Sequence, residues 1–481
     1  YPDSDEDIAP TYVFTSSWRS MGSERDIVSL QYTERSIEDP MKTKLPFKTY
    51  FGFGYGGIGQ YIWGLLFGFF MTPFLVQVAQ ISPFATGTLQ LVASIWTAII
   101  NPFIGIFSDM TPHPRRMIWI LFSIVPFCWF YMLFWLVPPF LGDTGLIIYY
   151  FVVYFICASA FMCYVVPYNA LSAEISPHYD ERTKLSTYRW VLSLMIGVVA
   201  IAGQSILVYS FKFPDGSFNL VRGYAVSGII MGIFLLTPAI GLATLVKEPV
   251  PANHSKKRTS ILKGFKLTLT NFPFMMVVLL NSCAWSTLSL MTNNLLLYIT
   301  YVVEEEKYFP FILISVLVCC TIGLPLWGTI TYKLGKKTVY IIGTALLAGA
   351  LFPTTFLQNG DIILMFVLPS LGGLGLGVLY LIPYSMVPDV VEYDELKTGQ
   401  RREGSFFSIF IFCEKLATGI TLAASNYTLG FMGFDASLGV GNQPDKVLWS
   451  IRILVGILPC IMLFISWIAC AFYPITKKKH T

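Results

Sequence analysis

Long apolar runs separated by short polar segments form the main pattern of this chain. The runs lack the strict alternation of apolar and polar positions that a half-buried strand or an outer-membrane barrel would show. Because a helix needs about 20 apolar residues to cross a bilayer, each run predicts a membrane-spanning helix. We expect twelve spans, at residues 50–78, 83–108, 117–138, 144–170, 185–209, 223–246, 273–301, 308–332, 338–357, 361–386, 404–431 and 449–473.

The composition agrees with this interpretation. Apolar residues make up 55% of the chain and charged residues 12%, whereas a soluble domain has about 25% charged residues. The nine cysteines lie mostly inside the apolar runs, which favours buried free thiols over a disulfide framework. The sequence therefore predicts an all-α protein embedded in a lipid bilayer.

The longest polar interruption, residues 247–266, separates the sixth span from the seventh. We divide the chain into an N-terminal arm (1–47), a first six-helix half (48–246), a central loop (247–272), a second six-helix half (273–474) and a basic tail (475–481). The arm is rich in Ser, Asp, Glu and Tyr, a composition typical of flexible segments. It is the segment where a protein partner would be expected to bind.

Lysine and arginine are distributed unequally between the two sets of loops. With a cytoplasmic N-terminus, the cytoplasmic segments from Lys42 onward carry 22 of these residues and the outer loops carry 4. The excess on one side predicts that both termini and the central loop are cytoplasmic. A plasma membrane location is favoured, and an organelle membrane remains the alternative.

Two loops of the first half are repeated in the second half. The segment "VVPYNALSAEISPHYDERTKLSTYRW" follows span four, and "LIPYSMVPDVVEYDELKTGQRREGSFF" follows span ten. Likewise, "GIFSDMTPHPRRMIWIL" follows span two and "GTITYKLGKKTVYII" follows span eight. A repeat offset by six spans predicts two parallel six-helix halves, which is the major facilitator fold.

Span two carries a stripe of polar and small residues spaced three or four apart. Its members are Thr86, Gln90, Ser94, Thr97, Asn101, Gly105 and Ser108. This spacing places them on one helical face, and a polar face inside a membrane is expected to line a cavity or meet a partner helix. Hydrogen bonding between helices is the alternative.

Two other spans have polar faces that could complete a substrate site. Span one carries Gly52, Gly56, Gln60, Gly64 and Gly68 at four-residue intervals; the glycines predict close helix packing, and Gln60 is the polar candidate. Span seven carries Ser282, Ser286, Ser289 and Asn293 on one face. We expect Gln60, Gln90, Ser289 and Asn293 near the substrate.

Two basic residues, Lys415 and Arg189, occupy unusual positions in the spans. Lys415 is about eleven residues into span eleven, near the middle of the membrane at about 1.5 Å per residue. A charged group at this depth needs a partner or water, and it indicates a functional site. Arg189 lies near the cytoplasmic end of span five, where it could also extend to the membrane surface.

Acidic and basic residues are grouped at the cytoplasmic ends of the spans in both halves. We expect them to form a cytoplasmic gate whose ion pairs hold the two halves together in the outward-open state. Helix-end electrostatics and the charge bias of cytoplasmic loops are the alternative explanation. The candidate gate residues are Asp109, Arg115, Arg116, Glu174, Glu181, Arg182, Asp389, Glu392, Arg401 and Arg402.

Other chemistries have little support in the sequence. The chain has no phosphate-binding loop and no His/Cys spacing typical of a metal site, and its glycine-rich segment 372–378 lies inside span ten instead of following a strand. We therefore expect no enzymatic activity, no catalytic residue, no cofactor, no metal site and no nucleic-acid partner.

Several segments resemble motifs of the glycoside–pentoside–hexuronide transporter family. These are "YGGIGQ", "IWTAIINPFIG", "RRMIWIL", "VPYNAL…ERTKLSTYR" and "PYSMVPDVVEYDELKTGQRREG". The family includes bacterial melibiose carriers, and the animal sodium-dependent lysophosphatidylcholine symporters are similar to it. The resemblance covers about Lys48 to Lys479. It implies alternating access coupled to Na⁺, H⁺ or Li⁺, with Arg189 and Lys415 matching basic positions near the substrate and coupling site.

Span two departs from the family pattern Trp-Asp-x-x-x-Asp-Pro, whose two carboxylates bind the coupling cation. Thr97 and Asn101 occupy the two acidic positions here. Their oxygens can ligate a cation, but they supply no negative charge to offset its dehydration. The sequence therefore argues against cation coupling through this site.

These features predict a secondary transporter that works by alternating access, either as a uniporter or with weak coupling. A sugar or glycoside and an amphiphile such as a lysophospholipid both remain candidate substrates, because aromatic side chains can stack on a sugar or pack against an acyl chain. The alternative is a transporter-derived scaffold or receptor subunit that does not transport.

Overall fold

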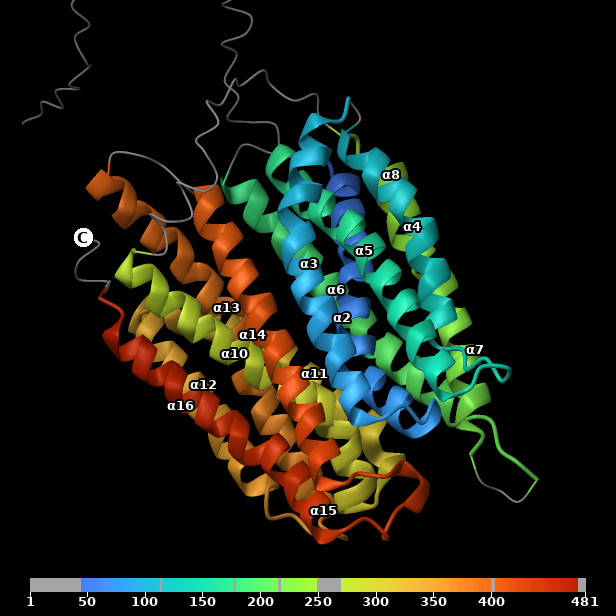
Figure 1. Ribbon diagram of the computed structural model, residues 1–481. Helices are drawn as coiled ribbons and strands as arrows, with labels where there is room; N and C mark the ends of the chain where they lie inside the picture. The colour runs from blue at the N-terminus through green and yellow to red at the C-terminus, as the bar shows by residue number, and fades with distance from the viewer. Residues whose placement is uncertain are drawn as a thin grey trace, which may run out of the picture. The chain divides into compact units, whose positions relative to one another are not determined.

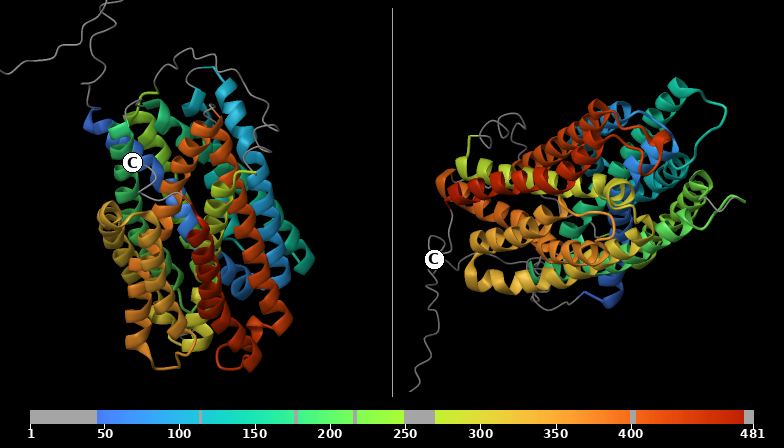
Figure 2. Two further views of the ribbon diagram at one scale, coloured as in Figure 1. Left: turned by 90° about the vertical axis from the view of Figure 1, so that its left-hand side faces the viewer. Right: turned by 90° about the horizontal axis from the view of Figure 1, so that it is seen from below.

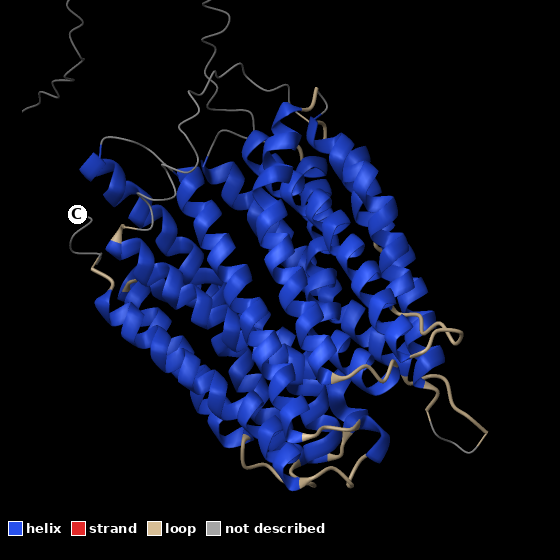
Figure 3. Ribbon diagram, viewed as in Figure 1, coloured by secondary structure: helices blue, strands red, loops and turns tan. Residues whose placement is uncertain are grey.

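The computed structural model describes residues 45–112, 115–175, 179–214, 218–248, 270–398 and 403–474. In these ranges the chain is almost entirely helical, and an isolated bridge between Lys212 and Phe218 is the single strand-like pairing (Figure 3). The helical segments are α2 (Phe47–Pro73), η1 (Phe74–Val78), α3 (Pro83–Met110), α4 (Arg115–Phe134), α5 (Asp143–Ile175), α6 (Tyr179–Val208), α7 (Leu220–Phe234), α8 (Leu236–Leu245), α10 (Phe272–Tyr298), η2 (Ile299–Val303), η3 (Glu306–Tyr308), α11 (Phe309–Leu334), α12 (Lys336–Thr354), α13 (Ile362–Thr398), α14 (Glu403–Met432), η4 (Ala436–Leu438), α15 (Asp445–Arg452), η5 (Ile453–Ile457) and α16 (Leu458–Phe472).

Within the described residues, 12 helical segments are long and apolar enough to cross a membrane. The prediction of twelve spans is confirmed. The sixth span consists of α7 and α8, and the twelfth consists of α15, η5 and α16. Large apolar side chains project outward from many of these helices, such as Phe122, which is 81% exposed. A water-soluble protein would bury such residues, whereas lipid solvates them.

The first six spans (α2–α8) and the last six (α10–α16) form two sets of packed helices, coloured blue to green and yellow to red in Figure 1. Among the described residues, the main contacts between the two sets are those of α3 with α14, α2 with α10, and α6 with α11. The same arrangement is visible from two further directions in Figure 2. The predicted six-plus-six organisation of the major facilitator fold is therefore present.

Because the spans alternate in direction, every second connection lies at the same end of the bundle. We call one end the basic end: α2, α4, α6, α10, α12 and α14 begin there. It carries most of the lysines and arginines in the connections and first helical turns, such as Lys48, Arg116 and Lys336. The opposite end, which contains η1, η2, η3 and η4, is called the far end.

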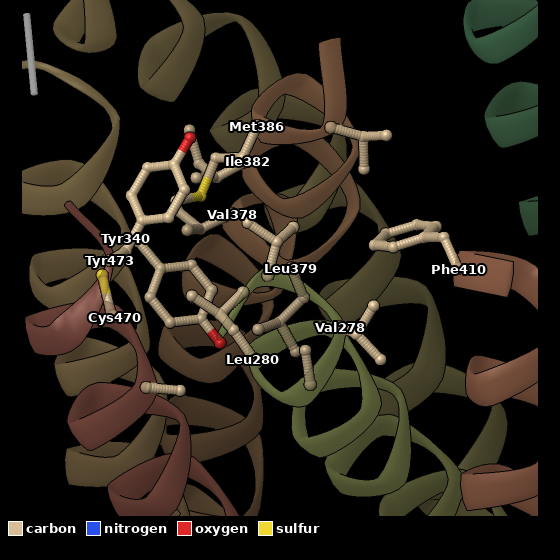
Figure 4. Packing of buried hydrophobic residues seen from close by; sticks show 14 of the residues in the cluster. Val278, Leu280, Tyr340, Val378, Leu379, Ile382, Met386, Phe410, Cys470 and Tyr473 are labelled. Atoms are coloured by element: carbon tan, nitrogen blue, oxygen red, sulfur yellow. The ribbon is translucent and has the colours of Figure 1, made fainter. Parts of the chain in front are cut away.

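Each half has its own packed interior. In the first half, aromatic rings dominate, as where Trp63 stacks on Phe161 with a centroid distance of 4.7 Å. In the second half, α10, α12, α13, α14 and α16 bury an aliphatic and aromatic cluster (Figure 4). Separate cores allow each half to keep its packing while the contacts between the halves change.

Candidate functional site

The polar stripe of α3 faces the interior of the bundle. Ile95, Ile99 and Phe103 are exposed on one side of this helix, and the stripe lies on the opposite side. Thr97 is buried and its hydroxyl donates to the carbonyl of Ser94 at 3.0 Å. Asn101, one turn closer to the basic end, is half-buried. The two residues thus occupy neighbouring turns of the inward face.

Toward the far end, four buried polar side chains from both halves form what we call the far-end cluster. Gln90 of α3 donates to Thr72 of α2 at 3.0 Å and to Asn293 of α10 at 3.2 Å. Asn426 of α14 donates to Gln90 at 2.8 Å, and Thr72 also donates to Asn293. All four side chains are at most 4% exposed. These neutral hydrogen bonds connect α2 and α3 to α10 and α14.

The sequence identified two of these four residues. Gln90 and Asn293 were expected near the substrate, and the structure places them in this contact between the halves. Thr72 was missed, although it continues the four-residue series from Gly52 to Gly68. Asn426 belongs to a glycosylation sequon, but its side chain is fully buried against Gln90. A buried amide is inaccessible to the modification.

Other contacts between the halves also lie toward the far end. The Thr88 and Tyr427 hydroxyls are 2.9 Å apart, and Tyr209 donates to Glu306 at 2.6 Å. The rings of Phe70 and Phe309 meet edge to face at 5.6 Å. Polar and aromatic contacts thus hold the far end together along more than one pair of helices.

The face of α2 shows how this contact changes along the helix. A Cβ added at Gly68 would meet Thr292 of α10 at 3.5 Å, in ordinary van der Waals contact. One turn closer to the basic end, a Cβ at Gly64 would meet no atom within 4 Å. Gln60, one further turn away, is half-buried and has no hydrogen bond to a described residue. The packing between the halves loosens from the far end toward the basic end.

Charged and aromatic residues meet near the middle of the bundle. Arg189 of α6 donates to Asn169 of α5 at 2.9 Å, and its guanidinium lies 5.3 Å from the ring centroid of Trp190. Across the interface, Trp190 and Tyr380 of α13 have ring centroids 6.0 Å apart. Trp285 of α10 meets the same tyrosine edge to face at 5.7 Å. A row of aromatic rings therefore leads from Arg189 across the interface to α13 and α10.

Lys415 also faces the interior. Gly419 of α14 packs against Ser94 of α3, and Ile420 is 54% exposed on the outer side. At 100° per residue, Lys415 lies one turn before Gly419 and about 140° around the helix from Ile420. Lys415 is half-buried, and it makes no hydrogen bond or ion pair with any described residue. An ammonium group therefore points inward without a carboxylate in direct contact.

Glu414, which precedes Lys415, is a buried carboxylate that sequence reasoning did not select as a site residue. It is 4% exposed. Its Oε2 accepts hydrogen bonds from Asn281 of α10 at 3.1 Å and from the Tyr384 hydroxyl of α13 at 2.8 Å. We call Arg189, Trp190, Tyr380, Tyr384, Glu414 and Lys415 the central cluster.

Two ion pairs at the basic end each lie inside one half. In the first half, Arg116 pairs with Glu174 at 2.9 Å, and in the second half Lys336 pairs with Asp389 at 2.7 Å. Arg116, Glu174 and Asp389 were predicted as gate residues, and Lys336 was not. Glu392 is exposed at the end of α13. The predicted role of these residues in joining the halves concerns another conformation and stays a prediction.

The remaining candidates are distributed as follows. Ser289 is buried on α10, one turn before Asn293. The side chains of Asp109, Arg115, Glu181 and Arg182, together with residues Arg401 and Arg402, lie outside the described part of the structure. The N-terminal arm, most of the central loop and the basic tail lie outside it as well. Across the described ranges, no group of three or more His, Cys, Asp or Glu side chains could hold a metal ion.

Two six-helix halves, joined at one end and enclosing inward-facing charged residues, define a transporter of the major facilitator type. The family model described as MFS/sugar transport protein matches residues 52–477. The chain belongs to this family.

Relatives of known name support the assignment. An uncharacterized symporter of Synechocystis sp. is 30% identical, with 91% of this chain and 96% of the relative covered. The sodium-dependent lysophosphatidylcholine symporter 1-A of Danio rerio is 28% identical, with 89% and 86% covered. In fold, the chain is similar to the nucleoside transporter NupG, with a TM-score of 0.66, 12% identity and coverage of 88% of this chain and 100% of that one.

Proposed function

We propose that this protein moves an amphiphile with an anionic or zwitterionic headgroup across the membrane by alternating access. The observation that carries the proposal is Lys415, an inward-facing cation with no carboxylate in ion-pair contact among the described residues. Arg189 supplies a second cation from the other half. A phosphate group between two such cations would replace water with charge-assisted hydrogen bonds.

The aromatic residues of the central cluster suit the remainder of such a molecule. Trp190 and Tyr380 meet across the two halves, and Trp285 packs on the same tyrosine. These rings offer apolar surface to an acyl chain. They can equally stack on a sugar ring, which keeps a glycoside as the second candidate. The similarity to lysophosphatidylcholine symporters favours the amphiphile.

We assign the basic end to the cytoplasm, because lysine and arginine concentrate in cytoplasmic loops. The far end, where the halves are in contact, is then the outer end. Under this assignment, contact between the halves at the outer end supports an inward-open conformation. In the outward-open state, the basic-end residues predicted as a gate would also meet across the halves.

Sodium coupling through α3 is not part of this proposal. Thr97 and Asn101 offer neutral oxygens, and no carboxylate lies among the other members of the α3 stripe, Thr86 to Ser108. A Na⁺ ion entering a low-dielectric site without compensating negative charge would lose its hydration at a large cost. We therefore expect transport that does not depend on a Na⁺ gradient.

Uptake of lysophosphatidylcholine into proteoliposomes tests the proposal, with Na⁺ or choline as the external cation. We expect equal uptake in both salts, a large loss in Lys415→Ala and partial retention in Lys415→Arg. Lys446→Ala, at an exposed lysine beyond α14, is the matched control. Uptake of a glycoside in place of the lysophospholipid would support the second candidate. A purified, folded protein that moves neither would support the scaffold alternative.

A further inference from the structure

We propose that Glu414 is a proton-binding site, and that its proton drives transport in place of the cation missing from α3. The coupling of this proton to transport rests on the proposed function, whereas the proton-binding site itself does not. The existence of a titrating carboxyl group at Glu414 can be tested without any substrate.

The first argument is the location of Glu414. The residue lies in the middle of a membrane-spanning helix, and it is 4% exposed. No lysine or arginine of the described residues comes within ion-pair distance of its carboxylate. Lys415 follows directly in sequence, but side chains of adjacent residues point about 100° apart on a helix. A carboxylate buried without an ion pair is strongly disfavoured unless it binds a proton or a cation.

The second argument is the set of hydrogen bonds around it. Oε2 of Glu414 accepts from the Asn281 amide and from the Tyr384 hydroxyl, which come from two other helices. Both partners can also serve a protonated carboxyl group, because a hydroxyl accepts as well as donates and an amide has both an oxygen and an NH₂ group. The site can therefore hold Glu414 in either protonation state.

Asn281 provides an independent observation. The residue is fully buried, and its Oδ1 has no hydrogen-bond partner in the described structure. A buried amide oxygen without a partner is uncommon. If Glu414 binds a proton, rotation of the amide exchanges Nδ2 for Oδ1 at the carboxyl group, and the new O–H group donates to Oδ1. Asn281 therefore keeps one hydrogen bond to Glu414 in either protonation state.

The charged and titratable groups near Glu414 come from few elements. Lys415 is its charged neighbour on the same helix, and Tyr384 of α13 is its titratable neighbour from another helix. α10 contributes Asn281, which does not titrate. Arg189 of the other half interacts electrostatically with Tyr384. The helices α3 and α15, which also pack on α14, bring no described charged side chain into contact with Glu414.

Tyr384 connects Glu414 to the interface between the halves. Its hydroxyl donates to the carboxylate, and it lies within electrostatic range of Arg189 of the other half. In one cycle, a proton leaves water on one side of the membrane, forms an O–H bond on Glu414, and returns to water on the other side. Electrons are not transferred, and one proton accompanies each substrate.

Infrared difference spectroscopy of the full chain in lipid nanodiscs tests the proton site directly. Between acidic and alkaline pH, we expect the carbonyl band of a protonated carboxyl group to titrate in the wild type. Glu414→Gln keeps an acceptor oxygen for both hydrogen bonds and removes that band. In Tyr384→Phe, we expect the carboxyl band to titrate with a shifted midpoint pH. Glu304→Gln, at an exposed carboxylate of the far end, leaves the band unchanged. An identical band in Glu414→Gln, or no titrating band in the wild type, would overturn the proposal.

Proteoliposomes test the coupling, with lysophosphatidylcholine as the probe. An inward proton gradient should raise its accumulation up to about tenfold per pH unit, the limit for one proton per substrate. In Glu414→Gln, the ratio of uptake with and without the gradient should fall to one, and Glu414→Asp should restore part of it. A gradient-insensitive wild type that still moves the probe would overturn the coupling. If the probe is not moved at all, the proposed substrate is wrong, and the infrared titration alone decides the proton site.

Discussion

The two ends of the bundle are held in different ways. At the far end, Gln90 joins residues of both halves through neutral hydrogen bonds inside a buried cluster. At the basic end, the ion pairs Arg116–Glu174 and Lys336–Asp389 each stay within one half. When the far-end contacts break, the two halves can therefore separate there. The ion pairs at the basic end instead stabilise each half by itself.

This difference has a physical reason. A contact that opens in every cycle must exchange its partners for water or lipid without a large cost. Neutral hydrogen bonds contribute about 0.5–1.5 kcal/mol each, so a few of them can open together. A buried ion pair that loses one partner costs several times more. Hydrogen bonds, one of which joins Tyr209 to the Glu306 carboxylate, hold the moving interface, whereas the ion pairs Arg116–Glu174 and Lys336–Asp389 lie inside the halves. This division suits a molecule that rocks between two states.

The largest effect is expected from a wedge between α3 and α14. A Cβ at Gly419 would overlap the Cβ of Ser94, which is fixed to the helix backbone. Gly419→Leu should therefore push the far end apart and abolish its closed state. Electron paramagnetic resonance between spin labels at Val221 and Ile363, both exposed at the far end, should show a longer distance. Gly328→Leu is the control, because a Cβ there meets nothing within 4 Å.

The second effect concerns the stability of the first half. Arg116 is 5% exposed and binds Glu174 and the Ser108 hydroxyl. Arg116→Ala leaves a mostly buried carboxylate without its partner and should lower the free energy of unfolding by about 3 kcal/mol. Thermal unfolding in detergent measures this loss. The far-end distance between the labels should stay unchanged; a change there would show that the pair also joins the halves.

A smaller effect is expected from the far-end cluster. Gln90→Leu removes three buried hydrogen bonds, which costs about 1–3 kcal/mol. Thr72 and Asn293 keep their mutual bond, and Asn426 keeps its bond to the Leu422 carbonyl. The same spin labels should report a larger open fraction at the far end. Ser227→Ala, which removes a buried hydrogen bond within the first half, should leave that fraction unchanged. Combining Gln90→Leu with Asn426→Leu should give less than the sum of both effects.

Lys336 offers a weaker counterpart to Arg116. Its ammonium binds Asp389, but the side chain is 32% exposed and water can replace the partner. Lys336→Ala should therefore lower the free energy of unfolding by about 1 kcal/mol or less. Equal losses in thermal stability for Arg116→Ala and Lys336→Ala would contradict the importance of burial for these pairs.

The smallest effect is a pH dependence in the far-end loop. The hydroxyl and the backbone N–H of Ser437 donate to Asp435, which lowers the pKa of this carboxyl below its usual value. A lowered pKa in the folded state stabilises the protein at neutral pH, and this contribution disappears as the pH falls through that value. At pH 7, Asp435→Asn should therefore have a slightly lower melting temperature than the wild type. The two melting curves should coincide at strongly acidic pH.

Much of the fold was accessible from the sequence. Apolar runs of sufficient length gave the twelve spans, because a helix is the structure that satisfies every backbone group of such a run inside lipid. The loop repeat gave the two halves, and family motifs gave the transporter class. The stripe on α3 was correctly assigned to the interior, because helical periodicity alone decides which residues share a face.

Which of these residues touch each other was decided by the tertiary structure. Gln90 and Asn293 lie 203 positions apart, and no periodicity within one helix indicates that they meet at the far end. The buried state of Glu414 likewise depends on Asn281 and Tyr384, which come from two other helices. A sequence determines the face on which a side chain lies, whereas its partners, burial and charge environment arise only when separate helices pack together.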